Sequence, residues 1–268
     1  MLEIQKFITE NPTDWATKLR KEPYNLLING RDGMILFKYV QFASDFSIPL
    51  VREARGIILD AETFEVVAHP FNKFFNFGEV HADNVDLSRS HVVEKVDGSI
   101  IKVFYYDGSW RVATNGTIDA SDAGTQLEGV TFRDLFNSVI GEENFENLTK
   151  LLSVEYTYMF EMIHPVSRVV VDYNGKKQLV FLGSRNNKTG IEHDIFGDDV
   201  FLETQHIFEW YGIRYPEKYD LNNVSDLSSL AEIAEKMNVN GTDFEGFIVT
   251  EVTDGIVSGR VKIKSAEY

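Results

Sequence analysis

Short segments of alternating apolar and polar residues, joined by turn signals, run through much of the chain and predict antiparallel hairpins. In the clearest case, residues 100–106 and 110–114 are rich in β-branched and aromatic side chains and flank the turn signal Asp107-Gly108. On the same grounds, two further hairpins are predicted at residues 55–68 and 246–264.

A longer strand is predicted at residues 154–163, where successive side chains point to opposite faces. Glu161 lies near its end, on the face opposite to Phe160 and Met162, and His164-Pro165 ends the strand. A fourth hairpin is predicted from residues 168–173 paired with 178–183 around Asn174-Gly175.

Apolar residues recur at helical spacing in five segments. The first is N-terminal, with Leu2, Ile4, Phe7 and Ile8 at helical spacing, and turns signalled by Asn29-Gly30 and Asp32-Gly33 follow it. The other helices are predicted at residues 131–140, 142–152, 199–210 and 225–237. Since no repeat, low-complexity tract or linker interrupts these elements, we expect one antiparallel-rich sheet system with peripheral helices.

Composition and charge narrow the possible functions. The 268 residues include no cysteine, which excludes disulfides, thiolate catalysis and cysteine-ligated zinc. No apolar run approaches the roughly 20 residues of a membrane span, and no signal-peptide pattern opens the chain, so we expect a cytoplasmic protein without a membrane partner. The formal charge of −16 argues against a general nucleic-acid coat. A local basic cleft remains compatible with it if the 26 basic residues cluster.

Residues 94–100 (EKVDGSI) hold the principal candidate for chemistry. Lys95 precedes a tight turn and a strand, so rigid backbone could hold its amine against an electrophile such as a nucleotide α-phosphate and allow a covalent lysyl intermediate. The alternative is a surface lysine beside an ordinary Asp-Gly turn. Because Lys-x-Asp-Gly is expected by chance in roughly 7% of chains of this length, the other motifs must decide.

Two other sets of residues have both a functional and a structural interpretation, and a pair of carboxylates is notable for its position. The run at residues 70–76 interleaves Lys73 with phenylalanines. Such a run could stack a base and bind a phosphate, or the phenylalanines could be buried core residues beside one solvated lysine. Lys262 and Lys264 share one face of a strand, either as a phosphate-binding pair or as a guard on an exposed edge. Glu161 and Glu245 are carboxylates at a strand end and a strand start.

Six motifs appear in one order with regular gaps, and together they resemble the covalent nucleotidyltransferases, which include DNA ligases, RNA ligases and mRNA capping enzymes. The motifs are Arg55-Gly56, Lys73-Phe74-Phe75, Lys95-Val96-Asp97-Gly98, Phe160-Glu161, Glu245-Gly246 and Val261-Lys262-Ile263-Lys264-Ser265. Their details are most similar to the ATP-dependent RNA ligase 1 family of tailed bacteriophages. Residues 161–168 (EMIHPVSR) also resemble the third motif of that family, so the resemblance spans residues 53–265.

The resemblance implies an α+β nucleotidyltransferase (ATP-grasp-like) domain of antiparallel sheets with peripheral helices. This adenylyltransferase domain would cover residues 1–268, with residues 1–50 as its N-terminal part. It also implies an RNA ligase in which Lys95 takes AMP from ATP, passes it to an RNA 5′-phosphate, and a 3′-hydroxyl then displaces it. The implied partners are RNA ends, including those of tRNA, and the implied form is a monomer, in the host cytoplasm if the gene is a phage gene.

The resemblance also implies a role for each site residue. Lys262 and Lys264 would support Lys95, whose reference pKa of about 10.4 must fall for attack, and would neutralise charge as pyrophosphate leaves. Glu161, Glu245 and Asp97 would hold hydrated Mg²⁺, with Mn²⁺ as a substitute. The remaining nucleotide-binding set is Arg55, Lys73, Phe75, Glu94, Gly98 and Gly246, in which Arg55 and Lys73 would bind ribose or phosphate, Phe75 would brace the pocket and the backbone around Glu94 would read adenine.

The chain departs from the family pattern at two places. Where the family usually has a basic residue, in a run like Ser-Lys-Gly-Ser, this chain has Thr114-Asn115-Gly116-Thr117, so one phosphate or ribose contact lacks its cation. The chain ends at Tyr268, where family members continue into a helical C-terminal domain. We therefore expect efficient self-adenylylation with weak, salt-sensitive sealing.

Two alternative functions remain open. A DNA ligase or a GTP-dependent capping enzyme would keep the lysyl-nucleotide chemistry with another acceptor, but neither predicts the Lys-Phe-Phe-Asn run at residues 73–76. A non-catalytic nucleotide-binding module would keep the fold without the chemistry, and Asn115 favours it. Labelling of the chain by ATP, with GTP and NAD as competitors, would separate these functions.

Overall fold

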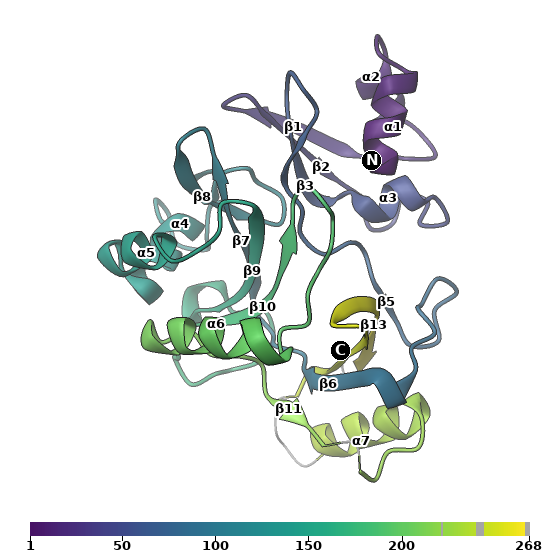
Figure 1. Ribbon diagram of the computed structural model, residues 1–268, viewed down its shortest axis with the longest axis vertical. Coiled ribbons are helices and arrows are strands. Elements are labelled where there is room, and N and C mark those ends of the chain that lie inside the picture. Colours follow the sequence, from purple (N-terminus) through teal and green to yellow (C-terminus); the bar gives the residue numbers. More distant parts are fainter. Residues whose placement is uncertain (221, 240–243, 266–268) are drawn as a thin grey trace.

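The chain folds into three sheets with helices around them, as seen in a computed structural model that describes residues 1–220, 222–239 and 244–265, apart from the side chains of residues 198–203, 238 and 239. The predicted α+β class is confirmed, but the strands form three separate sheets in place of one system. We name them the N-terminal, central and C-terminal sheets (Figure 1). Within the described residues, no helix is both long and apolar enough to cross a membrane.

The N-terminal sheet has the strand order β1-β2-β3-β4 and is antiparallel throughout. Its strands are β1 (Leu27–Arg31), β2 (Met34–Lys38), β3 (Arg55–Asp60) and β4 (Val66–Ala68), with helices α1 (Glu3–Glu10), α2 (Trp15–Leu19) and α3 (Pro49–Glu53) beside it. The predicted N-terminal helix and the hairpin at residues 55–68 are confirmed. The turn predicted at Asn29-Gly30 is wrong, because both residues lie in β1. The turn predicted at Asp32-Gly33 is confirmed, with φ of 50° and 78° between β1 and β2.

The central sheet has the order β10-β9-β7-β8 and is also antiparallel. Its strands are β7 (Ser99–Tyr106), β8 (Ser109–Thr114), β9 (Tyr156–Ile163) and β10 (Gln178–Asn186). Helices α4 (Phe132–Ile140), α5 (Glu142–Thr149) and α6 (Asp198–Trp210) flank the sheet (Figure 1). Phe208 packs against Phe160 and Phe181, and Phe136 packs against Phe145. All five belong to one core cluster, which fixes the helices on the sheet.

The predicted hairpin between residues 168–173 and 178–183 is wrong. Residues 178–183 do form a strand, in β10, but its partner is β9, in the register Gln178 to Ile163. The carboxylate of Asp97 accepts hydrogen bonds from the backbone N–H groups of Val170 and Val171, at 2.8 Å and 2.6 Å. Those donors are thus satisfied by a distant side chain, so the segment has no need of a strand partner.

The C-terminal sheet has the order β11-β6-β12-β13-β5, in which only β5 runs parallel to its neighbour β13 among the described strand pairs. Its strands are β5 (Phe75–Asn76), β6 (Ser90–Glu94), β11 (Lys218–Tyr219), β12 (Gly246–Thr253) and β13 (Ile256–Lys264). Helix α7 (Leu227–Val239) packs Leu230 and Ala234 against this sheet. The predicted hairpin at residues 246–264 is confirmed, and Val261 and Ile263 are buried as expected.

Short 3₁₀ turns complete the described structure at Leu87–Arg89, Ala120–Asp122 and Pro165–Ser167. The connection that matters most for the site is the one between β6 and β7. Strand β6 ends at Glu94 in the C-terminal sheet, and β7 starts at Ser99 in the central sheet. Residues 95–98 therefore cross from one sheet to the other, and this crossing carries Lys95.

Candidate active site

Lys95 lies where the central and C-terminal sheets meet, at the wall of a cavity of about 490 Å³. Its backbone N–H donates to the carbonyl of Gly246 at 2.8 Å, which fastens the crossing segment to the start of β12. Its Nζ lies 2.5 Å from Oε1 of Glu245. The predicted nucleophile is thus held at both its backbone and its ammonium group, beside a space large enough for a nucleotide.

Two carboxylates flank Lys95. Glu245 is 7% exposed and lies between Lys95 and Lys264, the latter at 3.9 Å. Burial raises the pKa of Glu161 to about 7; Lys95 opposes this rise, and Glu245 adds to it. Two carboxylates that repel each other in a desolvated place would gain from a shared cation.

The carboxylate pair fits a hydrated divalent ion. Oε2 of Glu245 is buried and has no hydrogen-bond partner among the described residues. Such an oxygen is costly to bury unless it binds a donor or a cation. In the described part of the chain, no three histidine, aspartate or glutamate side chains form a ready-made metal centre. An ion held here would therefore keep water or substrate oxygens as further ligands, as magnesium commonly does.

Asp97 does not line the cavity that Lys95 lines. As described above, its carboxylate binds the backbone of residues 170 and 171. The sequence-based role of Asp97 as a metal ligand stays a prediction, and its contacts in the structure are those of a residue that fixes the loop after β9.

A cluster of cations surrounds one end of the cavity. Burial lowers the pKa of Lys262 to about 7, and the nearby Lys73, Arg55, Lys95 and Lys264 lower it further. Lys262 and Arg55 each lie 5.2 Å from the ring centroid of Phe74. The aromatic ring thus helps to hold two cations together without a carboxylate.

Lys73 and Phe75 stand behind this cluster, outside the cavity wall. The Nζ of Lys73 lies 4.8 Å to 5.3 Å from the rings of Tyr39, Phe46 and Phe75. Burial lowers the pKa of Lys73, and the nearby Arg55 and Lys264 contribute. The predicted interleaving of lysine and aromatics is therefore an aromatic cage around an ammonium group, close enough to the cluster to act on it electrostatically.

Two glycines allow other backbone segments to approach closely beside the charged site residues. Gly56 and Gly246 have φ of 83° and 139°, and a Cβ at either position would overlap a carbonyl oxygen, of Asn115 and Ile263 respectively. Each glycine directly follows a charged site residue, Arg55 or Glu245. The Arg-Gly and Glu-Gly pairs in the sequence therefore have a steric cause.

The side chain of Glu94 is not free to read a base. Its carboxylate is ion-paired with Arg214 and accepts the N–H of Glu217 at 3.0 Å. Glu94 still lines the cavity, as does Gly98, but the backbone N–H of Glu94 donates to the carbonyl of Glu217 at 2.9 Å. Recognition of adenine by the backbone around Glu94 stays a prediction. Val93, Leu182 and Ile248 give this part of the cavity an apolar lining that suits an aromatic base.

Sequence reasoning missed Lys102, which is fully buried in β7. Its Nζ donates to the carbonyl of Gly56 at 2.5 Å, and burial lowers its pKa to about 7, with Lys38 and Arg55 adding to the effect. The only signal was a lysine inside a strand whose neighbours are apolar. Ile101 and Val103 enter one core cluster and Phe104 another, so both faces of the strand are covered.

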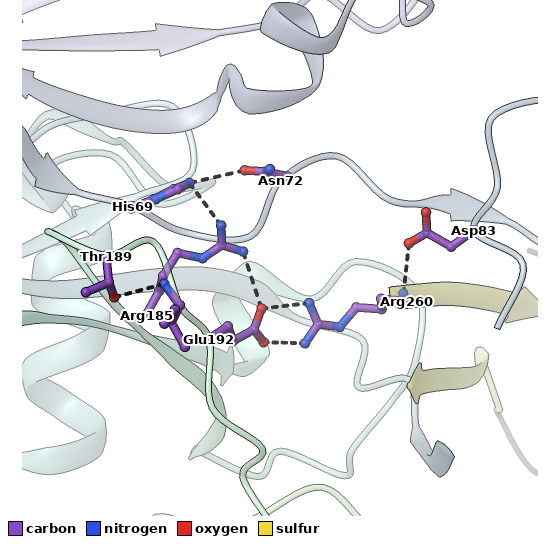
Figure 2. A network of polar contacts seen from close by, with 8 residues as sticks. His69, Asn72, Asp83, Arg185, Thr189, Glu192 and Arg260 are labelled. Atoms are coloured by element: carbon purple, nitrogen blue, oxygen red, sulfur yellow. Dashed lines mark hydrogen bonds and ion pairs between the residues drawn. The ribbon is translucent and has the colours of Figure 1, made fainter. Parts of the chain in front are cut away.

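Sequence reasoning also missed a buried network at the cavity wall. Figure 2 shows Glu192 between two arginines, Arg185 and Arg260. Arg185 lies 3.3 Å from Glu192, and the guanidinium group of Arg260 also lies 4.4 Å from the ring centroid of Phe71. Arg185 in turn contacts Nε2 of His69 at 3.0 Å. The network joins β10, β13 and the segment after β4, one element from each sheet or its edge. No sequence motif marked it, because its members are far apart in the chain.

Comparisons with known proteins identify the family to which the chain belongs. A family model described as RNA ligase matches residues 53–268. An RNA ligase of Rhodothermus phage RM378 is 28% identical over 97% of this chain and 68% of its own length. RNA ligase 1 of bacteriophage TS2126 is 30% identical over 53% of this chain and 37% of its own length.

A protein of Autographa californica nuclear polyhedrosis virus, assigned as a bifunctional polynucleotide kinase/RNA ligase, is 30% identical over 88% of this chain. The chain spans only 33% of that viral protein. An archaeal ATP-dependent RNA ligase of known structure shares the fold, with a TM-score of 0.57 and 15% identity over 99% of this chain and 65% of its own. Since the family model covers most of the sequence, the chain belongs to the RNA ligase family.

Proposed function

We propose that the protein is an ATP-dependent RNA ligase that works through a lysyl-AMP intermediate on Lys95. The observation that carries this proposal is the position of the Lys95 ammonium group, at the wall of a nucleotide-sized cavity and between a carboxylate and a cation cluster. Family membership and the names of the viral, phage and archaeal relatives support it.

In the first step, Nζ of Lys95 attacks the α-phosphorus of ATP. A P–N bond forms, the bond from this phosphorus to the bridging oxygen breaks, and pyrophosphate leaves. Lys95 must lose its protons to become a nucleophile and then a phosphoramidate, and Oε1 of Glu245 is placed to receive one. Lys262, Lys264 and Arg55 stabilise the negative charge on the departing pyrophosphate.

In the two later steps AMP moves to RNA and is then released. An oxygen of the RNA 5′-phosphate attacks the AMP phosphorus, which breaks the P–N bond and returns the electron pair to Lys95. A 3′-hydroxyl then attacks the 5′-phosphate, forms the phosphodiester bond and expels AMP. The proposed partners are RNA ends, those of tRNA included, and the proposed form is a monomer in the host cytoplasm.

Glu161 and Glu245 would hold hydrated Mg²⁺, or Mn²⁺ in its place, near these phosphates. When bound, the ion would offset phosphate charge and polarise the phosphorus–oxygen bonds. Arg55 and Lys73 are proposed to bind or orient phosphate, Phe75 to hold Lys73, and Gly98 and Gly246 to shape the nucleotide pocket.

The first test is labelling of the chain by ATP that carries the label on its α-phosphate. We expect label on the wild type with Mg²⁺ or Mn²⁺ and none on Lys95→Ala, because only the amine can form the bond. Lys188→Met is the control, since Lys188 is 81% exposed and pairs only with Glu155 among the described residues. A wild type that never takes label over a range of pH and metals would show that the fold lacks this chemistry.

The second test identifies the acceptor. Labelled protein offered 5′-phosphorylated RNA should transfer AMP and then seal it to a 3′-hydroxyl end. Nicked DNA should accept little AMP, and unlabelled GTP or NAD should compete poorly for labelling. Preference for GTP would point to capping chemistry, and preference for nicked DNA to a DNA ligase.

A further inference from the structure

Lys38, at the end of β2, lies outside every motif but close to the cavity. Its Nζ lies 3.2 Å from the point that a Cβ on Gly116 would occupy, and Gly116 and Asn115 both line the cavity. Its side chain is half-buried, and within the described residues it makes no ion pair or hydrogen bond. A half-buried ammonium group without a hydrogen-bond or ion-pair partner can accept a negatively charged ligand.

Two other cations lie near Lys38, because Arg55 is its cross-strand partner and Lys102 is buried close to both. Lys38 and Arg55 both act on the buried Lys102, and none of the three has a carboxylate within ion-pair distance among the described residues. Lys102 is committed to the carbonyl of Gly56, while Arg55 lies on the cavity wall within electrostatic range of Glu161. In a chain of charge −16, three neighbouring cations without a paired carboxylate indicate that an anion belongs between them.

We propose that Lys38 and Arg55 form a phosphate-binding subsite at the edge of the cavity that Asn115 and Gly116 line. This inference rests on the proposed function, and it places a cation beside Asn115, a position that itself carries none. The ligand class is a phosphate group, either of the ATP polyphosphate or of the RNA 5′ end. Lys102 would act as a positioning residue, because its bond to Gly56 fixes the backbone that carries Arg55.

The test measures binding separately from chemistry. Titration calorimetry with inorganic tripolyphosphate should show about tenfold weaker binding to Lys38→Met than to wild type, as expected for one charge-assisted contact to phosphate. Lys188→Met, which removes an equal charge from the exposed surface, should bind like wild type. Equal affinity of Lys38→Met and wild type for tripolyphosphate, together with an unchanged transfer of AMP to 5′-phosphorylated RNA, would overturn the proposal.

The two sources of phosphate give different outcomes, and each supports the subsite. If the ligand is the ATP polyphosphate, tripolyphosphate binding and ATP labelling weaken while transfer from pre-labelled protein to RNA does not. If it is the RNA 5′-phosphate, that transfer weakens alone. A wild type that binds tripolyphosphate but never takes label would overturn the proposed function and leave the subsite standing.

A charge relocation provides the second variant. Lys38→Met combined with Asn115→Lys returns a cation to the same edge of the cavity from a neighbouring element, so it should recover most of the lost binding. Lys38→Arg should keep the binding as well, because it keeps the charge. Failure of both to exceed Lys38→Met, in proteins with wild-type melting curves, would show that the charge at this edge has no role.

Discussion

Lys262 combines a position that suits phosphate binding with burial that disfavours its own positive charge. Its burial and four neighbouring cations lower its pKa to about 7, so near neutral pH it is only partly protonated. The folded-state pKa of Lys262 lies below the usual 10.5. Between about pH 7 and pH 10.5, this lysine therefore binds fewer protons in the folded chain than in the unfolded chain. The free energy of unfolding is therefore reduced near pH 7 and recovers as the pH rises toward 10.5. Burial of this ammonium group thus destabilises the free protein, and a bound anion would offset that loss.

We predict that ATP binding takes up a proton through Lys262. A phosphate beside this ammonium group favours its charged form, which raises its pKa in the complex. At pH 8, the calorimetric enthalpy of binding should therefore differ between buffers of high and low ionisation enthalpy, and the affinity should fall as pH rises from 7 to 9. Lys262→Arg stays charged throughout this range and should lose most of the buffer dependence. Equal enthalpies for the wild type in both buffers would contradict the assignment.

The sequence indicated some site residues much better than others. Lys95, Glu161, Glu245, Lys262 and Lys264 stand at strand starts or ends, or at alternating positions, so local pattern places each one. Lys38 and Lys102 could not be found in this way. Their positions are defined by Gly116, in the loop after β8, and by Gly56 on β3, which approach them only in the assembled fold.

At the scale of elements, the hairpins were predictable and the sheets were not. A hairpin such as β7 and β8 is determined by its own alternation and by one Asp-Gly turn, all within 16 residues. The pairing of β9 with β10 depends instead on Asp97, which satisfies the backbone of the segment that was expected to be the other strand. The division into three sheets follows from long-range contacts of the same kind.

The Glu192 network should be the strongest connection between these elements. Glu192→Gln would leave Arg185 and Arg260 without their shared countercharge at a place where little water can compensate. We expect urea unfolding to show a loss of about 3–5 kcal/mol, as found when one partner of a buried ion pair is removed.

Glu155→Gln is the matched control, because the pair of Glu155 with Lys188 is exposed, and it should change stability by less than about 1 kcal/mol. The two variants remove the same charge from the same residue type. Similar losses in both would mean that the network contributes no more than a surface pair.

At the scale of the whole molecule, positive charge is concentrated rather than abundant. Besides Arg185 and Arg260, which pair with Glu192, seven of the 26 basic residues lie close together in or beside the cavity, in a chain whose formal charge is −16. The seven residues are Lys38, Arg55, Lys73, Lys95, Lys102, Lys262 and Lys264. Such a cluster can bind the few phosphates at an RNA end, whereas the net negative charge of the chain disfavours binding of a long polyanion.

We therefore predict a weak but defined salt dependence of RNA binding. With about three phosphate contacts, the logarithm of the binding constant should fall with the logarithm of salt concentration at a slope of about −2. Fluorescence anisotropy of a short 5′-phosphorylated RNA would measure it, and Lys264→Ala should reduce the slope by about 0.7, since one contact is lost. A slope near −6 would instead indicate contacts along the RNA backbone beyond the cluster.

The two glycines that follow Arg55 and Glu245 have a consequence for how this chain tolerates mutation. Neither needs to touch a substrate, yet at both positions any side chain would overlap a carbonyl oxygen of another strand or loop. In a library of single substitutions, variants at Lys95 should remain abundant and inactive, while variants at Gly56 and Gly246 should disappear from the folded pool. Abundance and activity scores would thus separate the residues retained for chemistry from those retained for geometry, although both kinds sit side by side in the sequence.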